Sequence, residues 1–142
     1  MKNTFYLLNM DVSGIKSIQE NVHLSFYKKT VDKGFDSEKY RVKAIYGENG
    51  AGKSALVTAV KIFQDLILDD NYLNDSKTQI FLDEIVNKVT QNFYFDCEFL
   101  FCSNNTSRVY HYSVSIGKRE NGIYEIQSEH LKVKNGNYAN SR

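Results

Sequence analysis

The segment from Gly47 to Ser54 constrains the fold more than any other part of this sequence. Its eight residues, Gly-Glu-Asn-Gly-Ala-Gly-Lys-Ser, match the pattern G-x-x-x-x-G-K-S/T at every fixed position. An apolar, β-branched run precedes the segment, and a run with helical periodicity follows it. In this setting backbone N–H groups surround a phosphate at a helix N-terminus, and glycine lets the backbone approach closely. The sequence therefore predicts a phosphate-binding loop between a strand and a helix.

The residues of this loop have distinct expected roles at a nucleoside triphosphate. Lys53 is expected to reach the β- and γ-phosphates, and the Ser54 hydroxyl is expected to complete the coordination of Mg²⁺. We therefore predict ATP and Mg²⁺ as ligands and assign the binding site to Gly47, Glu48, Asn49, Gly50, Ala51, Gly52, Lys53 and Ser54. The alternative is a glycine-rich turn that caps a helix and leaves Lys53 solvated.

Strand and helix signals alternate around the loop. Strand-like runs at 4–12, 22–27 and 40–46 precede it, and the polar stretch 28–39 is predicted to be a surface loop. From Lys53 onward, apolar residues recur at three- and four-residue spacing. This spacing predicts a helix whose buried face contains Leu56, Ala59, Val60, Phe63, Leu66 and Ile67.

A second helix and a β-layer are predicted to follow. We expect the helix at 76–90, with Ser76 as N-cap and Gln79 completing a capping box. Its expected buried face contains Phe81, Leu82, Ile85, Val86 and Val89. Three alternating strands with short polar turns then predict an antiparallel meander over 91–134.

These elements predict a mixed α/β fold in one nucleotide-binding domain, 1–142, whose P-loop core is 1–75. An ATPase also needs an acidic residue at the end of a buried strand to hold the metal. The candidate is Ile80-Phe81-Leu82-Asp83-Glu84, but Gln79 interrupts its apolar run and the capping pattern favours a helix. Asp83 and Glu84 are therefore predicted to be solvated surface charges.

Composition narrows the class of protein. Hydrophobic residues at 42% and charged residues at 25% are ordinary for a globular chain, and a net charge of +1 gives no overall positive field. Cys97 and Cys102 lack the further ligands of a zinc site and are predicted to be reduced and buried. His23, His111 and His130 are expected on the surface, without metal spacing or a paired carboxylate. No signal peptide or membrane span is recognised, so we expect a cytoplasmic protein that does not contact a membrane.

A family resemblance adds to these expectations. Three segments together resemble the start of an ATP-binding-cassette-type ATPase. They are the run Asn-Met-Asp-Val-Ser-Gly-Ile-Lys-Ser-Ile at 9–18, the strand 22–26 and the phosphate-binding loop at 47–54, whose pattern is known as the Walker A motif. The closest subgroup contains the structural-maintenance-of-chromosomes, RecF and overcoming-lysogenization-defect proteins, which are commonly labelled AAA family ATPases in bacteria. The Gly-Ile-Lys-Ser turn at 14–17, similar to the family's Gly-Phe-Lys-Ser, narrows the choice. The resemblance extends over most of the chain and implies a P-loop NTPase fold with an antiparallel β-layer in the N-terminal lobe.

The resemblance also implies roles and partners. It places Lys16 near the phosphates and makes Gln127 a candidate for the glutamine that contacts Mg²⁺. Adenine stacking on Phe26 or Tyr27 is a further expectation. In the family, ATP is hydrolysed between two heads, so the implied partners are the remainder of the head or a second head in a homodimer. The nucleotide state would then drive dimerisation and control a DNA-directed or phage-defence effector.

The family's signature sequence, Walker B strand and switch histidine do not appear in this chain. We therefore expect an N-terminal segment of a longer ATPase, with no catalytic residue of its own and with Lys53 and Lys16 as the nearest candidates. The alternative is a self-contained P-loop module, either a kinase or a GTPase-like switch. The sequence Asn-Lys-Val-Thr at 87–90 argues against the GTPase-like form, because it lacks the aspartate that would recognise guanine.

Overall fold

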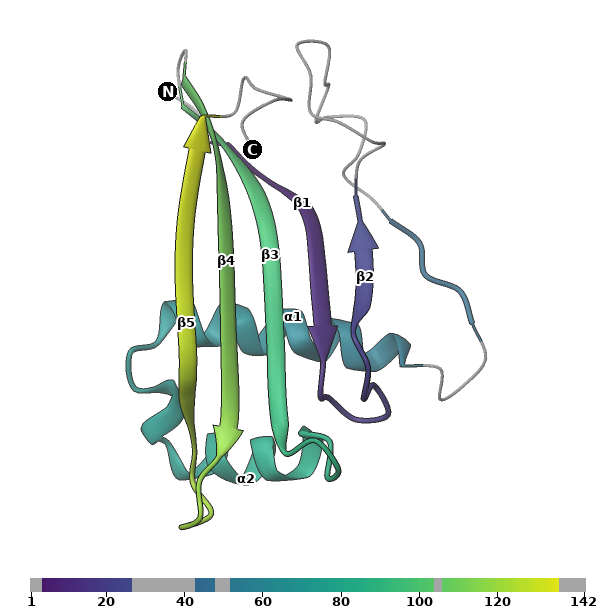
Figure 1. The fold of residues 1–142 in the computed structure, drawn as a ribbon, viewed down its shortest axis with the longest axis vertical. Coiled ribbons are helices and arrows are strands. Elements are labelled where there is room, and N and C mark those ends of the chain that lie inside the picture. Colours follow the sequence, from purple (N-terminus) through teal and green to yellow (C-terminus); the bar gives the residue numbers. More distant parts are fainter. Residues whose placement is uncertain (1–3, 27–42, 48–51, 104–105, 136–142) are drawn as a thin grey trace.

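A computed structural model describes residues 4–26, 43–47, 52–103 and 106–135. These residues form a mixed α/β fold, in which two α-helices lie on one face of a five-stranded sheet (Figure 1). The strands are β1 (Thr4–Ser13), β2 (Val22–Ser25), β3 (Asn92–Ser103), β4 (Thr106–Lys118) and β5 (Tyr124–Asn135). The helices are α1 (Lys53–Leu68) and α2 (Ser76–Ile85), with a short 3-10 helix η2 (Tyr72–Asn74) between them. Neither α-helix, within the residues described, is long and apolar enough to cross a membrane.

The sheet has the order β2-β1-β3-β4-β5, and every neighbouring pair is antiparallel. Strands β3 to β5 form the predicted meander, which is confirmed. Along β3 the buried side chains Phe93, Phe95 and Cys97 alternate with the half-buried Tyr94 and Asp96, as the two-residue period of a strand requires. The sequence did not indicate that β1 lies between β2 and β3.

Helix α1 packs against one face of the sheet. The predicted helix is confirmed, but its most buried side chains are Ala55, Leu56, Ala59 and Ile62. Phe63 lies at the flank of this face and stacks on Phe95, with ring centroids 4.6 Å apart. Burying a side chain such as Ile62 stabilises the fold by roughly 1.5–3 kcal/mol. The prediction was wrong for Ile67, which is 53% exposed because the last turn of α1 borders an open cavity.

Helix α2 begins at the predicted residue but is capped differently. Its N-cap is Asp75, whose carboxylate accepts a hydrogen bond from the Lys77 backbone N–H at 3.2 Å, so the predicted Ser76 cap is wrong. Gln79 makes no capping box either. Its side-chain Nε2 donates to the carbonyls of Leu73 and Tyr124, and its Oε1 accepts from the Tyr124 N–H at 2.8 Å. Gln79 therefore joins α2 to β5.

The second helix is also shorter than predicted, because it ends at Ile85 rather than at residue 90. Val86 is extended and forms an isolated bridge with Ile15, which takes this part of the chain out of the helix. Val89 was predicted to be buried and is 77% exposed. A contact distant in sequence thus overrides the local periodicity.

The prediction of a strand at 40–46, before the phosphate loop, is wrong for residues 43–46. Residues 40–42 lie outside the described part of the chain. Lys43 to Gly47 are exposed and form no strand. The segment is held beside β2 through side chains: the Lys43 ammonium bonds to the Ser25 carbonyl and lies 5.7 Å from the centroid of the Phe26 ring. Without a backbone ladder to a neighbouring strand, an apolar run does not become a strand.

Both cysteines are free, as predicted, but only Cys97 is buried. Burial raises the pKa of the Cys97 thiol to about 12, with smaller contributions from Asp96 and Glu98. Cys102 is half-buried, and its Sγ lies 3.5 Å from the Ser107 hydroxyl. Successive side chains of a strand point to opposite faces, and Cys97 is at an odd-numbered position of β3 whereas Cys102 is at an even-numbered one. The two thiols therefore lie on opposite faces of β3 and cannot pair.

Candidate phosphate-binding site

The described part of the predicted loop lies at the start of α1. Gly47, Gly52, Lys53 and Ser54 are placed, whereas the assigned residues Glu48, Asn49, Gly50 and Ala51 lie outside the described residues. The Lys53 ammonium donates a hydrogen bond to the Gly47 carbonyl. The first glycine of the motif and its lysine are therefore in contact.

The first turn of α1 offers backbone donors to an anion. Gly52 is its N-cap, with a φ of 90° in the left-handed region that favours glycine. Gly52 has no side chain with which to cap this end, and no acidic residue lies in the first turn of α1. The backbone N–H groups here and the positive end of the helix dipole can therefore act on a phosphate.

The turn at 14–18 packs against the same end of α1. A Cβ built on Gly52 would lie 3.0 Å from Ile18 Cγ1 and 3.9 Å from Ser17 Oγ. Ile18 is buried and forms a bridge with Ile15 across the turn, while Lys16 between them is exposed. The structure thus brings together two sequence features that were singled out separately, the Gly-Ile-Lys-Ser turn and the phosphate loop.

Gln127 lies elsewhere. It is an exposed residue of β5, and its side-chain oxygen accepts a hydrogen bond from Asn92 Nδ2 at 2.7 Å. Strand β5 forms the opposite edge of the sheet from β2, and α1 starts on the β2 side (Figure 1). The structure therefore does not bring Gln127 together with Ser54.

Asp83 and Glu84 lie in α2, which confirms that the apolar run before them is not a buried strand. Asp83 is not simply solvated as predicted: its Oδ1 accepts from Lys118 Nζ at 2.6 Å and lies 3.7 Å from Lys88 Nζ. The hydrogen bond from Lys118 and the charges of both lysines hold the pKa of the Asp83 carboxyl below its usual value. Glu84 is exposed, as predicted.

The lowered pKa of Asp83 predicts a loss of stability in acid. An aspartate with a depressed folded-state pKa contributes stability above its unfolded pKa, about 3.9, and this contribution disappears as the pH falls through the folded value. Asp83→Asn should therefore lower the melting temperature at pH 7, and the difference from the unsubstituted protein should shrink in acid. Thermal unfolding at several pH values measures this. Glu84→Gln is the control and should match the unsubstituted protein; a pH-independent Asp83→Asn difference would contradict the prediction.

Two histidines pair with carboxylates, contrary to prediction. His23 Nδ1 lies 3.0 Å from Asp11 Oδ2, and His111 Nε2 lies 2.6 Å from Asp96 Oδ2. Asp11 and Asp96 are themselves opposite each other on β1 and β3. His130 is exposed on β5, as predicted. The described parts of the chain hold no group of three His, Cys, Asp or Glu side chains arranged to bind a metal ion.

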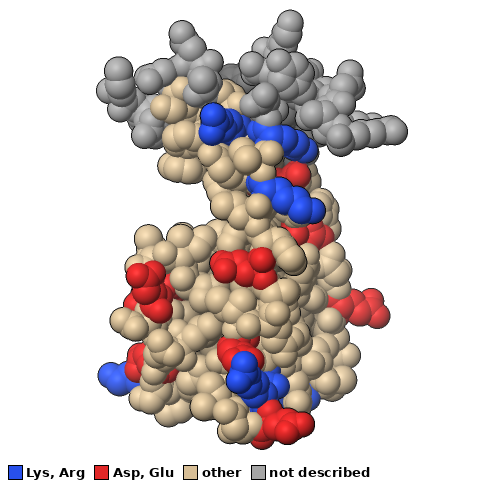
Figure 2. Space-filling model, turned by 60° about the vertical axis from the view of Figure 1, so that its left-hand side comes forward, with Lys and Arg blue, Asp and Glu red and all other residues tan. Residues whose placement is uncertain are grey.

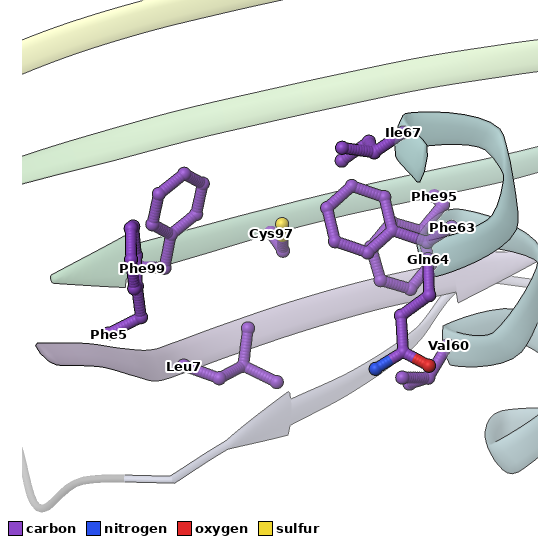
Figure 3. A pocket seen from close by; sticks show the side chains of 9 residues that line it. All are labelled: Phe5, Leu7, Val60, Phe63, Gln64, Ile67, Phe95, Cys97 and Phe99. Atoms are coloured by element: carbon purple, nitrogen blue, oxygen red, sulfur yellow. The ribbon is translucent and has the colours of Figure 1, made fainter. Parts of the chain in front are cut away.

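A cavity of about 420 Å³ lies between α1, the N-terminal part of β1 and residues 95–99 of β3 (Figure 3). Phenylalanine rings dominate its lining, and Gln64 is the polar side chain among the lining residues that the structure describes. Such a surface does not suit a triphosphate, because a buried charge needs charged or hydrogen-bonding partners. The helix residues that line it, from Val60 to Ile67, begin about two turns after Lys53. The cavity is therefore separate from the phosphate loop.

Figure 2 shows a face on which Lys and Arg side chains lie near the upper end and again near the lower end, with Asp and Glu side chains beside and between them. Basic residues therefore do not cover this face continuously.

No protein-family model, curated protein or solved structure matches the chain. The loop and the turn beside it are therefore the features of the chain that indicate a function.

Proposed function

We propose that this chain binds Mg-ATP through the loop from Gly47 to Ser54, as the nucleotide-binding part of a cassette-type ATPase head. The observation that carries the proposal is the contact between Lys53 and Gly47 at the N-terminus of α1, where the N-cap residue is a glycine. The motif alone would fit many nucleotide-binding proteins. The packing of the turn at 14–18 against Gly52, mainly through Ile18, supports the narrower class.

The donors at this site fit the proposed ligand. Backbone N–H groups of the first turn of α1 would bind phosphate oxygens, and the Lys53 ammonium would exchange the Gly47 carbonyl for the β- and γ-phosphates. The Ser54 hydroxyl offers Mg²⁺ a hard oxygen ligand, and the metal would bridge phosphate oxygens and neutralise their charge. Lys16 would add a second cation beside the loop.

The chain's own residues account for binding better than for hydrolysis. Asp83 on α2, which the sequence offered as a metal-binding carboxylate, accepts a hydrogen bond from Lys118 at the end of β4. We propose that the remainder of the head or a second head supplies the groups that activate water. Control of a DNA-directed or phage-defence effector by the nucleotide state belongs to this proposal.

Comparing nucleotides tests the proposal directly. Calorimetric titration with Mg-ATP should give saturable binding, and Mg-GTP should bind more weakly. The physical reason is the absence from the sequence of the Asn-Lys-x-Asp pattern that recognises guanine. Inorganic triphosphate controls for affinity due to the phosphates alone. Equal or guanine-preferring binding would contradict the ATPase-head proposal and favour a GTPase-like switch.

A further inference from the structure

Asn87 is a buried polar residue in the short link between α2 and β3. It is 8% exposed, and Thr78 is the other buried polar side chain in the described part of the chain. A buried amide is costly unless its donors and acceptors are satisfied. The partners of Asn87 therefore show what this residue does.

The two ends of the Asn87 side chain bind different segments. The side-chain Nδ2 donates to the Lys16 carbonyl at 2.8 Å. Its Oδ1 accepts from the backbone N–H groups of Val89 at 2.9 Å and Thr90 at 3.2 Å. The oxygen thus shapes the local turn after α2, and the nitrogen reaches the turn that packs against the phosphate loop.

Backbone hydrogen bonds reinforce this contact. The Lys16 N–H donates to the Ile85 carbonyl at 2.7 Å, and the Asn87 N–H donates to the Gly14 carbonyl at 2.9 Å. Both backbone polar groups of Lys16 are therefore held, one by the last residue of α2 and the other by Asn87 in the link that follows it. This matters because Lys16 has a φ of 49°, in the left-handed region that residues other than glycine rarely adopt.

We propose that Asn87 is a positioning residue for the triphosphate, an inference that rests on the proposed function. Asn87 holds the Lys16 backbone in its left-handed conformation, so that the exposed Lys16 side chain starts from a fixed place beside the loop. Ile18, in the same turn, packs against Gly52, which directly precedes Lys53. The link between α2 and β3 thereby fixes one wall of the phosphate site without touching the nucleotide.

Replacing the amide by a carboxylate separates the two functions of Asn87. Asn87→Asp keeps an oxygen for the N–H groups of Val89 and Thr90 but loses the donor to Lys16. Gln79→Glu is a matched control, because Gln79 Nε2 also donates to backbone carbonyls, those of Leu73 and Tyr124, away from the turn. If the Asp variant is not folded by circular dichroism, Asn87→Ser takes its place, since a hydroxyl can accept from the same backbone groups.

Mg-ATP affinity, measured by calorimetry on the full chain, is the readout. We expect Asn87→Asp to weaken binding roughly three- to tenfold, the factor that one net hydrogen bond is worth, and Gln79→Glu to leave it unchanged. Lys16→Ala should weaken binding as well. The double variant should lose less than the product of the two single losses, because Asn87 acts through Lys16.

The outcomes separate the two proposals. Unchanged affinity in Asn87→Asp or in Lys16→Ala, fully independent losses, or an equal loss in Gln79→Glu would overturn the positioning role. In each of those cases Mg-ATP binding by the unsubstituted chain would leave the proposed function standing. Failure of the unsubstituted chain to bind Mg-ATP would overturn the proposed function itself, and with it the role of Asn87.

Discussion

Replacing Lys53 by Ala is expected to remove most of the affinity for Mg-ATP. The Lys53 ammonium is the charged donor within the loop itself, and hydrogen bonds from a charged group contribute roughly 1.5–3 kcal/mol each. The loss should therefore be about tenfold to more than a hundredfold. Calorimetric titration of the variant against Mg-ATP, under the conditions used for the unsubstituted chain, measures it.

The matched control for Lys53→Ala is Lys61→Ala on the same helix. Lys61 is exposed and pairs with Asp65 one turn further along α1. Exposed ion pairs of this kind contribute little to the free energy of unfolding, so Lys61→Ala should leave α1 folded. Because Lys61 lies outside the phosphate loop, the variant should keep the full affinity for Mg-ATP. Thermal unfolding should show that both variants remain folded. If Lys53→Ala binds Mg-ATP as tightly as Lys61→Ala does, the role assigned to Lys53 is wrong.

Gly14→Ala is expected to destabilise the whole fold. Gly14 has a φ of 74°, and a Cβ there would lie 1.7 Å from the Asn92 carbonyl oxygen. That oxygen belongs to the backbone of β3, so it cannot move aside without disturbing the sheet. The strained backbone and the overpacking together should cost roughly 2–5 kcal/mol, which urea unfolding would measure as a lower midpoint.

Gly122→Ala separates the two contributions to this loss. Gly122 has a similar φ of 84°, but the nearest atom to its added Cβ is Lys118 Cε at 3.9 Å. This variant should show only the cost of the left-handed conformation, about 1–2 kcal/mol. Equal destabilisation by the two substitutions would mean that the contact between Gly14 and Asn92 contributes nothing.

Local patterns in the sequence predicted the elements that have a clear local periodicity. The periodicity of α1 and the alternation in β3, with short turns after it, are properties of neighbouring residues. The errors arose where distant segments meet. Val86 leaves the helix because it pairs with Ile15, and Lys43–Tyr46 form no strand because no ladder is available to them. No local sequence pattern indicates that β1 pairs with β3.

The same distinction applies to the candidate site. The Walker A pattern is contiguous, so it could be recognised without a structure. Asn87 could not, because its importance lies in a hydrogen bond to Lys16, far away in the sequence. In the sequence Asn87 belonged to a segment predicted to be helical. Nothing in that segment indicated that the Asn87 side chain would be buried, since the expected buried face of the helix did not include it.

The hydrogen bonds of the turn at 14–18 have a consequence for how the chain must be assembled. Lys16 and Gly14 bond to residues 85–87, and β1 completes its ladder only with β3, at 92–103. Residues 1–75, which hold the whole phosphate-binding motif, therefore lack the partners that give the neighbouring turn its shape. Closing such long loops costs chain entropy before the contacts form. During synthesis, the motif leaves the ribosome well before the segments that shape the wall beside it.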